Sequence, residues 1–250
     1  GKTDPIRDIE IINTELILAD YEIVENRISK IEKKATTTKD KEALKELNVL
    51  NVCKENLEKN IPLRNVEFTV EDLDILKNFN FITLKKVIYV SNVGEEDIAQ
   101  RGNDYSNRVD EFAKSENSES IVMCAKLESD LASLNDDDKR EFLKELGISE
   151  SGLDRLILSS YKLLGLRTFF TSGTDECRAW TFKDGMKAPA CAGIIHSDFE
   201  RGFIKAEVMS YDDLFTYGSE LKVKEQGRLR LEGKDYLVQD GDIIYFRFNV

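Results

Sequence analysis

The sequence predicts a multidomain protein of mixed α/β and α+β class. Three observations support this prediction. Apolar residues recur at helical spacing over residues 9–57, two continuous apolar runs flank a helical stretch over residues 87–125, and alternating strands follow residue 165. A chain of 250 residues is long enough to bury two or three separate cores.

The amino-terminal part is predicted to form an antiparallel pair of helices. The first carries apolar residues at alternating three- and four-residue steps, namely Ile9, Ile12, Leu16, Ala19 and Ile23, with Val24, Ile28 and Ile31 on an adjacent stripe. The segment 35–40, ATTTKD, interrupts this pattern. A second helix follows, with its apolar line at Leu44, Leu47, Leu50, Cys53 and Leu57, and ends before Pro62 because proline disfavours a helical predecessor. A shared apolar seam must stabilise both helices, since each alone is marginal.

The middle of the chain is predicted to hold a strand–helix–strand unit. A capping box at Thr69–Asp72 opens a short helix that reaches Phe79. The apolar runs 87–90 and 120–125 suit strands buried on both faces, and a helical stretch over 105–115 separates them. This order predicts a right-handed βαβ unit of a parallel sheet. Because two strands cannot cover themselves, we expect further strands upstream of these residues.

The last third of the chain is predicted to contain two helices and then a mixed sheet. The helices, 135–146 and 151–164, each end at a glycine. A β-hairpin over 167–182, turning at Ser172-Gly173-Thr174-Asp175, precedes a helix near 196–202 and strands at 204–209 and 243–248, with a turn at Asp240-Gly241-Asp242. A mixed sheet with a helix across one face is a β-grasp, or ubiquitin-like, pattern.

Charge, hydropathy and cysteine spacing limit the partners, the location and the metal sites that this sequence predicts. The net charge is −12, but residues 165–250 carry 12 Lys and Arg against 14 Asp and Glu. An acidic chain is a poor non-specific binder of nucleic acid, so RNA contact is expected only at a local patch, without DNA specificity. No apolar run spans a membrane and no secretion signal opens the chain, which indicates the cytosol. The four cysteines form no C-x-x-C pair, so buried reduced thiols are expected and no metal site.

One motif resembles a phosphate-binding loop without meeting its requirements. Gly1-Lys2-Thr3 matches the end of a Walker A loop, whose backbone amides hold phosphates. Such a loop must follow a strand and open a helix. Here the first glycine of the pattern is absent and Asp4-Pro5 follows, so no phosphate binding is expected at this place.

Two loops after the predicted parallel strands are candidates for binding a nucleotide base. Ligands of open α/β sheets bind beyond the carboxyl ends of the strands, where Asn92-Val93-Gly94-Glu95 and Cys124-Ala125-Lys126 both lie. An Asn amide pairs with the N6 amine and N7 of adenine, whereas the Asp of the N-K-x-D motif selects guanine. The two loops resemble the N-x-x-E and S-A-K base-recognition loops of P-loop nucleotidases, and this resemblance implies base contacts from Asn92, Val93, Glu95, Cys124, Ala125 and Lys126. The alternative is an ordinary pair of strand-to-helix loops.

A third motif, His196-Ser197-Asp198-Phe199-Glu200-Arg201-Gly202, lies in the β-grasp segment. It lacks a nucleophile with a positioned base, so no catalytic residue is expected. The segment resembles the helix of TGS domains, and this resemblance implies a binding surface. Exposed cations suit contacts to an RNA backbone, and the candidates for ribosome or RNA contact are Arg201, Lys205, Lys222, Lys224, Arg228, Arg230 and Lys234. A solvated charged face is the alternative for each of them.

These motifs together resemble the YchF, or Obg-like, ATPase family, from RDIEIINTELILADYE to the terminal FRFNV. Asn92-Val93-Gly94-Glu95 resembles the family's N-x-x-E base-recognition motif, Cys124-Ala125-Lys126 resembles the S-A-K loop with Cys in place of Ser, and Gly1–Pro5 matches a GK-x-DP segment before a helical insertion. The resemblance implies four parts: a remnant of a P-loop G domain over 1–8, a coiled-coil arm over 9–80, the carboxy-terminal part of the G domain over 81–165, and a TGS domain over 166–250.

The resemblance also implies a function. The family hydrolyses ATP in preference to GTP, uses Mg²⁺, and associates with ribosomes or ribosomal RNA in the cytoplasm. Its phosphate and metal ligands belong to segments that these residues lack, so the chain is expected to be a carboxy-terminal part that hydrolyses little or no ATP and binds no cofactor tightly. The alternative is a non-enzymatic adaptor that binds ribosome, RNA or protein through the arm and the TGS domain.

Overall fold

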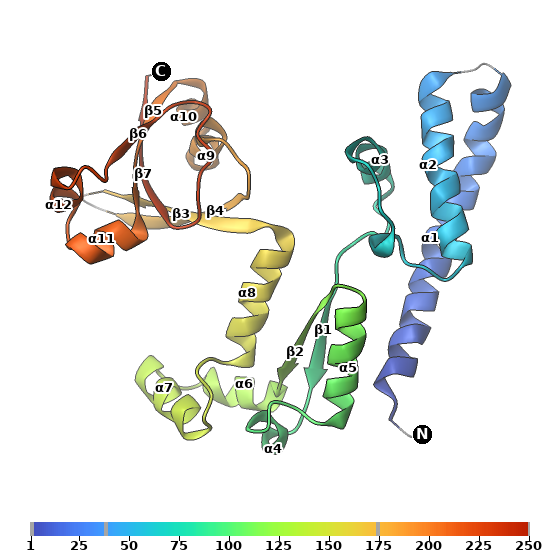
Figure 1. Ribbon diagram of the computed structural model, residues 1–250, viewed down its shortest axis with the longest axis horizontal. Helices are drawn as coiled ribbons and strands as arrows, with labels where there is room; N and C mark the ends of the chain where they lie inside the picture. The colour runs from blue at the N-terminus through green and yellow to red at the C-terminus, as the bar shows by residue number, and fades with distance from the viewer. Residues whose placement is uncertain (1–2, 38–39, 174–175, 250) are drawn as a thin grey trace. The chain divides into compact units, whose positions relative to one another are not determined.

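The computed structural model describes residues 3–37, 40–173 and 176–249 (Figure 1). The chain divides into two compact units, an amino-terminal unit up to Leu156 and a carboxy-terminal unit from Ile157. The first two residues of the Gly1-Lys2-Thr3 motif and the second half of the predicted turn at 172–175 lie outside the described residues. No helix of the described part is long and apolar enough to cross a membrane.

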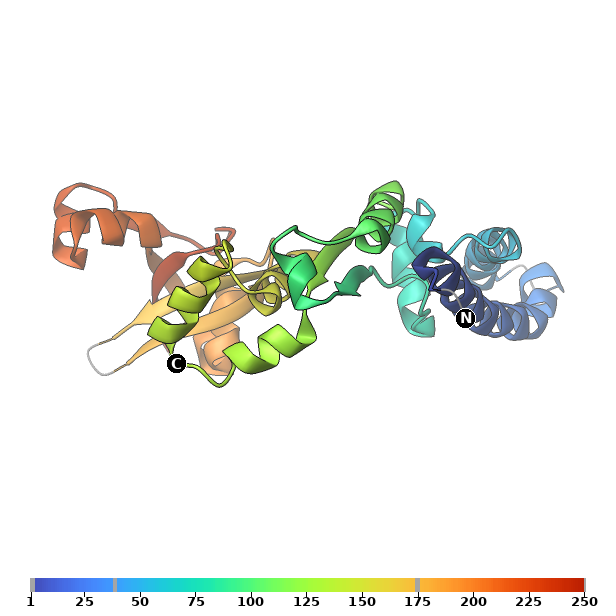
Figure 2. The same ribbon diagram turned by 90° about the horizontal axis from the view of Figure 1, so that it is seen from below.

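The amino-terminal unit begins with a helical arm. Helices α1 (Pro5–Thr37) and α2 (Lys41–Glu58) lie side by side in both views (Figures 1 and 2). Their seam buries Val24 and Ile31 of the adjacent stripe predicted for α1 and Leu47, Leu50, Cys53 and Leu57 of the line predicted for α2, together with Ile17, which lies on neither. Ile12 and Ile23 are exposed, contrary to the predicted stripe. α2 is shorter than α1 and ends beside Thr14, so it leaves the start of α1 uncovered.

The arm differs from the prediction at its tip. α1 continues through Ala35 to Thr37, although the threonines were expected to break it. Thr36 donates its hydroxyl hydrogen to the Glu32 carbonyl four residues earlier, which lets a threonine stay helical. Asp40 then caps α2 by accepting hydrogen bonds from the backbone N–H groups of Glu42 and Ala43.

The chain returns along the arm through short helices. They are η1 (Leu63–Asn65), α3 (Val70–Leu76) and η2 (Lys77–Phe79), and Thr69 and Asp72 form the predicted capping box. The buried carboxylate of Asp20 on α1 accepts hydrogen bonds from the backbone N–H groups of Ile82 and Thr83 and from the Thr83 hydroxyl. This carboxylate fixes the returning segment against α1.

A parallel two-stranded sheet follows, as predicted. β1 (Ile88–Asn92) pairs with β2 (Glu119–Met123), and α5 (Asp104–Ser115) connects them. Short helices follow each strand: α4 (Glu95–Ile98) after β1, and α6 (Ala125–Leu131), α7 (Asp136–Glu145) and α8 (Gly152–Leu164) after β2. Burial of β1 on both faces was wrong for the described residues, since Val90 is exposed. Only one neighbouring strand, β2, pairs with β1 in the part of the chain that is described.

The carboxy-terminal unit contains a five-stranded mixed sheet of order β4-β3-β7-β5-β6. The strands are β3 (Leu166–Ser172), β4 (Cys177–Lys183), β5 (Phe203–Ser210), β6 (Arg230–Glu232) and β7 (Asp242–Phe248). Helices α9 (Ala188–Ile195) and α10 (Ser197–Arg201) lie against one face around Phe169, Ala206 and Phe246. Helices α11 (Tyr211–Tyr217) and α12 (Glu220–Glu225) pack around Met209 and Ile243. Gly241 has the left-handed φ of +80° expected of its turn.

The cysteine prediction was wrong at one position. Cys53, Cys124 and Cys191 are buried, and burial raises the pKa of the Cys53 and Cys191 thiols to about 12. Cys177, however, is exposed. It begins β4, an edge strand, and alternation of side chains points it away from the core residue Phe182.

Candidate nucleotide-base site

The two candidate loops lie next to each other. β1 and β2 are parallel and in register from Ile88 opposite Glu119 to Asn92 opposite Met123, so both strands end at the same edge. The Val93 N–H donates to the Met123 carbonyl, which extends the pairing into the loops. Side chains that follow the two strands therefore face one region of the surface.

Asn92 joins the two loops directly. Its Oδ1 accepts a hydrogen bond of 2.9 Å from the Ala125 backbone N–H. A backbone N–H can only donate, so this bond sets the orientation of the Asn92 amide and directs Oδ1 to Ala125. Among the described residues, no partner is found for Asn92 Nδ2, which lies at an exposed position with two hydrogens to donate.

An ion pair crosses between the same loops. Lys126 Nζ lies 2.7 Å from Glu95 Oε1, and this hydrogen bond, together with the charge of Glu95, raises the pKa of Lys126. Both side chains are largely exposed, so the pair stabilises the fold little. Its effect is to position the lysine chain beside a cleft of about 360 Å³ lined by Asn92, Val93, Gly94, Glu95, Glu96, Cys124 and Lys126.

Five of the six predicted residues line this cleft, and the sixth, Ala125, donates its backbone N–H to Asn92 Oδ1. Asn92, Glu95, Ala125 and Lys126 are exposed. Val93 and Cys124 also pack in an apolar cluster with Ile98 and Leu127. Sequence reasoning omitted Gly94 and Glu96, although their place in the same loop was a sufficient signal. A Cβ on Gly94 would meet the Glu96 carboxylate.

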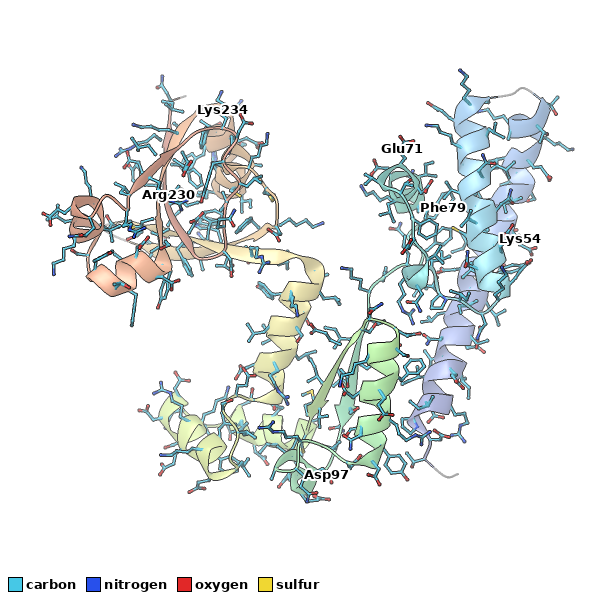
Figure 3. All side chains as sticks on the ribbon, in the orientation of Figure 1. Lys54, Glu71, Phe79, Asp97, Arg230 and Lys234 are labelled. Atoms are coloured by element: carbon cyan, nitrogen blue, oxygen red, sulfur yellow. The ribbon has the colours of Figure 1, made fainter. Side chains whose placement is uncertain are left out.

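Hydrogen bonds connect α4, which follows the loop after β1, to the start of α5. Asp97, labelled in Figure 3, accepts a 2.7 Å hydrogen bond from Asn103 Nδ2, and the Gly102 N–H donates to the Asp97 carbonyl. Asn103 in turn caps α5. The end of β1 is therefore fixed to the helix that connects the two strands.

The polar side chains that line the cleft are Asn92, Glu95, Glu96 and Lys126. Lys126 is the cationic side chain that lines the cleft. In the ranges 3–37, 40–173 and 176–249, no cluster of three or more His, Cys, Asp or Glu side chains could hold a metal ion.

The candidate RNA-contact residues all lie in the carboxy-terminal unit, and they differ in exposure and in whether they pair with a carboxylate. Lys222 and Lys224 on α12, Arg228 after it and Lys234 are exposed. Arg230 contacts the buried Asp242 at 3.2 Å, and Arg201 is paired with Asp198. Lys205 is half-buried on β5. Figure 3 labels Arg230 and Lys234 in this unit.

His196 has a structural role at the start of α10. Its Nδ1 accepts a hydrogen bond from the Asp198 backbone N–H and so caps α10. A histidine that accepts through Nδ1 carries no proton on that nitrogen.

The chain is similar to proteins of one family along its whole length. The family model YchF-GTPase_C, described as "Protein of unknown function (DUF933)", matches residues 166–249. The "Ribosome-binding ATPase YchF" of Bacillus subtilis is 56% identical over 251 residues, which cover all of this chain and 68% of that protein. The protein of the same name from Escherichia coli O157:H7 is 46% identical over 250 residues, again covering 68% of the relative.

Solved structures agree. The structure of the Schizosaccharomyces pombe YchF GTPase matches with a TM-score of 0.91 at 33% identity, covering 99% of this chain and 67% of that one. A GTP-binding protein from Pyrococcus horikoshii OT3 matches with a TM-score of 0.61 at 16% identity, which shows likeness of fold alone. With the residue motifs, the sequence identity and the fold in agreement, this chain belongs to the YchF family.

Proposed function

We propose that this chain carries the base-recognition side of a nucleotide site that prefers ATP over GTP, in a ribosome-associated ATPase. The observation that carries the proposal is the hydrogen bond from the Ala125 N–H to Asn92 Oδ1, which ties both strand-end loops to one cleft. Relatives named ribosome-binding ATPase support the nucleotide and the ribosome as partners and a cytoplasmic location.

The preference for adenine follows from which atoms remain free. Asn92 Nδ2 can donate to N7 of either purine, and the second lone pair of Oδ1 can accept from the N6 amine of adenine. Guanine presents its O6 acceptor at that position, where it would face Oδ1. The Ala125 N–H is already engaged, and Glu95 is held by Lys126 instead of being free for the ring N–H and amine of guanine.

Hydrolysis needs groups that these residues do not supply. In phosphoryl transfer, the P-loop Lys and Ser/Thr together with Mg²⁺ position the phosphates and stabilise the developing charge. The 250 residues contain no G-x-x-x-x-G-K-[ST] sequence. We therefore propose that the phosphate and Mg²⁺ ligands lie outside them, and that this chain alone has little or no turnover. An assay that finds robust Mg²⁺-dependent ATP hydrolysis by this chain would refute this part.

Base recognition is tested by ligand-observed NMR on the chain with adenosine and guanosine. Loss of two hydrogen bonds at about 1 kcal/mol each would weaken adenosine binding by more than about tenfold in Asn92→Ala. Asn107→Ala, an exposed Asn on α5 that does not line the cleft, is the matched control and should bind normally. Equal signals from adenosine and guanosine, or an unchanged Asn92→Ala, would contradict the proposed site.

The domain assignment is proposed on the same grounds. Residues 1–8 and 81–165 would belong to a G domain, 9–80 to a coiled-coil arm inserted in it, and 166–250 to a TGS domain of β-grasp type. The match of the family model to 166–249 and a mixed sheet with α9 and α10 on one face support the last part.

A non-enzymatic adaptor is the second candidate, and exposed cations on the carboxy-terminal unit favour it. Lys222, Lys224 and Arg228 are all exposed. Sedimentation with purified ribosomes at increasing salt, without nucleotide, separates the two proposals. Binding that persists without nucleotide and weakens as salt increases would show that the chain binds ribosomes independently of a bound nucleotide.

A further inference from the structure

A groove opens on the arm, between its two long helices and the returning segment. It has a volume of about 770 Å³, and its walls come from α1, α2 and the segment 71–79. Figure 3 shows Glu71 at α3 and Phe79 in the segment beside α2. We refer to it as the arm groove. The candidate base site uses none of its residues.

The rim of the arm groove is acidic. Four carboxylates stand against two cations: Glu42, Glu46, Glu71 and Asp74 against Arg27 and Lys45. Arg27 donates from Nε and Nη2 to the two carboxylate oxygens of Glu46, at 2.6 and 3.0 Å, and so neutralises that carboxylate within the wall. Glu71 is different, because its side chain is 80% exposed.

The ammonium group of Lys45 already contacts a carboxylate on the rim of the groove, and a cation from a partner would make the same contact. Lys45 Nζ on α2 lies 3.2 Å from Glu71 Oε2 on α3, and both side chains are more than half exposed. An exposed pair of this kind stabilises the fold by about 0–1 kcal/mol, so a cation from a partner can replace Lys45 at little cost. Asp74, also exposed, pairs with the exposed Lys77 three residues on and lies on the same wall.

The floor of the groove is apolar. Ile75 and Phe79 line it and pack on the arm core, and the Phe79 ring stacks on the buried Phe81 ring with centroids 5.2 Å apart. A lysine or arginine side chain buries its alkyl stem on such a floor while its charged end reaches the rim. Phosphates of a nucleic acid would meet the carboxylates instead and be repelled.

We propose that the arm groove docks a Lys- or Arg-rich segment of a protein, and that on the ribosome its contact is a ribosomal protein and not ribosomal RNA. The inference rests on the proposed ribosome binding and deepens it by assigning the class of partner at one surface. Charge complementarity and the apolar floor carry it together.

The test is co-sedimentation of the full chain with purified bacterial ribosomes. Glu71→Lys/Asp74→Lys reverses two rim charges and should weaken binding by about tenfold, since two charge contacts become repulsive. Glu15→Lys/Glu22→Lys, an equal charge change at exposed positions of α1 that do not line the groove, should stay within about twofold. If circular dichroism shows that the reversed variant is misfolded, Glu71→Gln/Asp74→Asn replaces it, with an expected loss of about threefold.

The sign of the effect decides between protein and RNA. Tighter binding of the charge-reversed variant means that phosphates face the groove and overturns the proposal, as does equal binding of all variants. A photo-reactive phenylalanine analogue at the exposed position Asn78 should cross-link to a Lys- or Arg-rich peptide of a ribosomal protein. Sedimentation with cross-links to ribosomal RNA, or with none, overturns this inference alone. Failure to sediment with ribosomes overturns the proposed ribosome binding and this inference with it.

Discussion

Removal of the Asp20 carboxylate should loosen the base of the helical arm. Asp20 is fully buried on α1 and accepts hydrogen bonds of 3.0, 2.7 and 2.6 Å from Ile82 N, Thr83 N and Thr83 Oγ1. Asp20→Ala leaves these donors without the acceptor that fixes them. The Thr83 backbone is buried with its side chain, whereas Ile82 is exposed enough for water to replace the lost partner.

The magnitude follows from this difference. A hydrogen bond to a charged group contributes about 1.5–3 kcal/mol, so the two bonds to Thr83 set an expected loss of about 3–6 kcal/mol in the free energy of unfolding. The desolvation cost of the buried carboxylate offsets part of this, which favours about 3 kcal/mol. With a urea dependence of about 2 kcal/mol per M, the unfolding midpoint should fall by about 1.5 M.

Two spectroscopic probes make the result specific. Helical circular dichroism is dominated by the long helices of the amino-terminal unit, and the single tryptophan, Trp180, reports on the carboxy-terminal unit. Asp20→Ala should shift the dichroism transition and leave the Trp180 fluorescence transition in place. Glu22→Ala, at an exposed position two residues on, should change stability by less than about 0.5 kcal/mol. A midpoint shift below about 0.3 M, or an equal shift at Trp180, would refute the reasoning.

Three further outcomes are expected. Gly202→Ala places a methyl group against a backbone carbonyl and should destabilise the carboxy-terminal unit by about 1–3 kcal/mol in Trp fluorescence, whereas Gly233→Ala, with open space, should not. Lys34 donates a hydrogen bond to Asp40 and is the chief reason that the pKa of Asp40 lies below its ordinary value of 3.8. The free energy that Asp40 contributes to folding is therefore complete above pH 3.8 and is lost as the pH falls through the lowered pKa. Asp40→Asn should therefore flatten the acid loss of helical dichroism below about pH 4. A thiol reagent should modify Cys177 quickly in the native chain and the three buried thiols only after denaturation, and two fast thiols would contradict this.

Local signals predicted elements where they agreed with tertiary packing. The capping box at Thr69, the Asn135 cap at the start of α7, and the Gly147 and Gly165 stops all occupy the expected places, because each acts within four residues. Short helices such as α11 and α12 escaped prediction. Their stability comes from packing against Met209 on β5 and Ile243 on β7 more than from a repeating pattern of their own.

Sequence by itself determined that a helical arm, a parallel strand pair and a mixed sheet follow one another, and that two loops end the parallel strands, because periodicity and turn residues act locally. Only the tertiary structure decided that Asn92 directs Oδ1 to Ala125, that Glu95 holds Lys126, and that Asp20 fixes residues 82 and 83. These partners lie between 31 and 63 residues apart in the chain, and a hydrogen bond forms only after the fold has brought donor and acceptor within about 3 Å of each other.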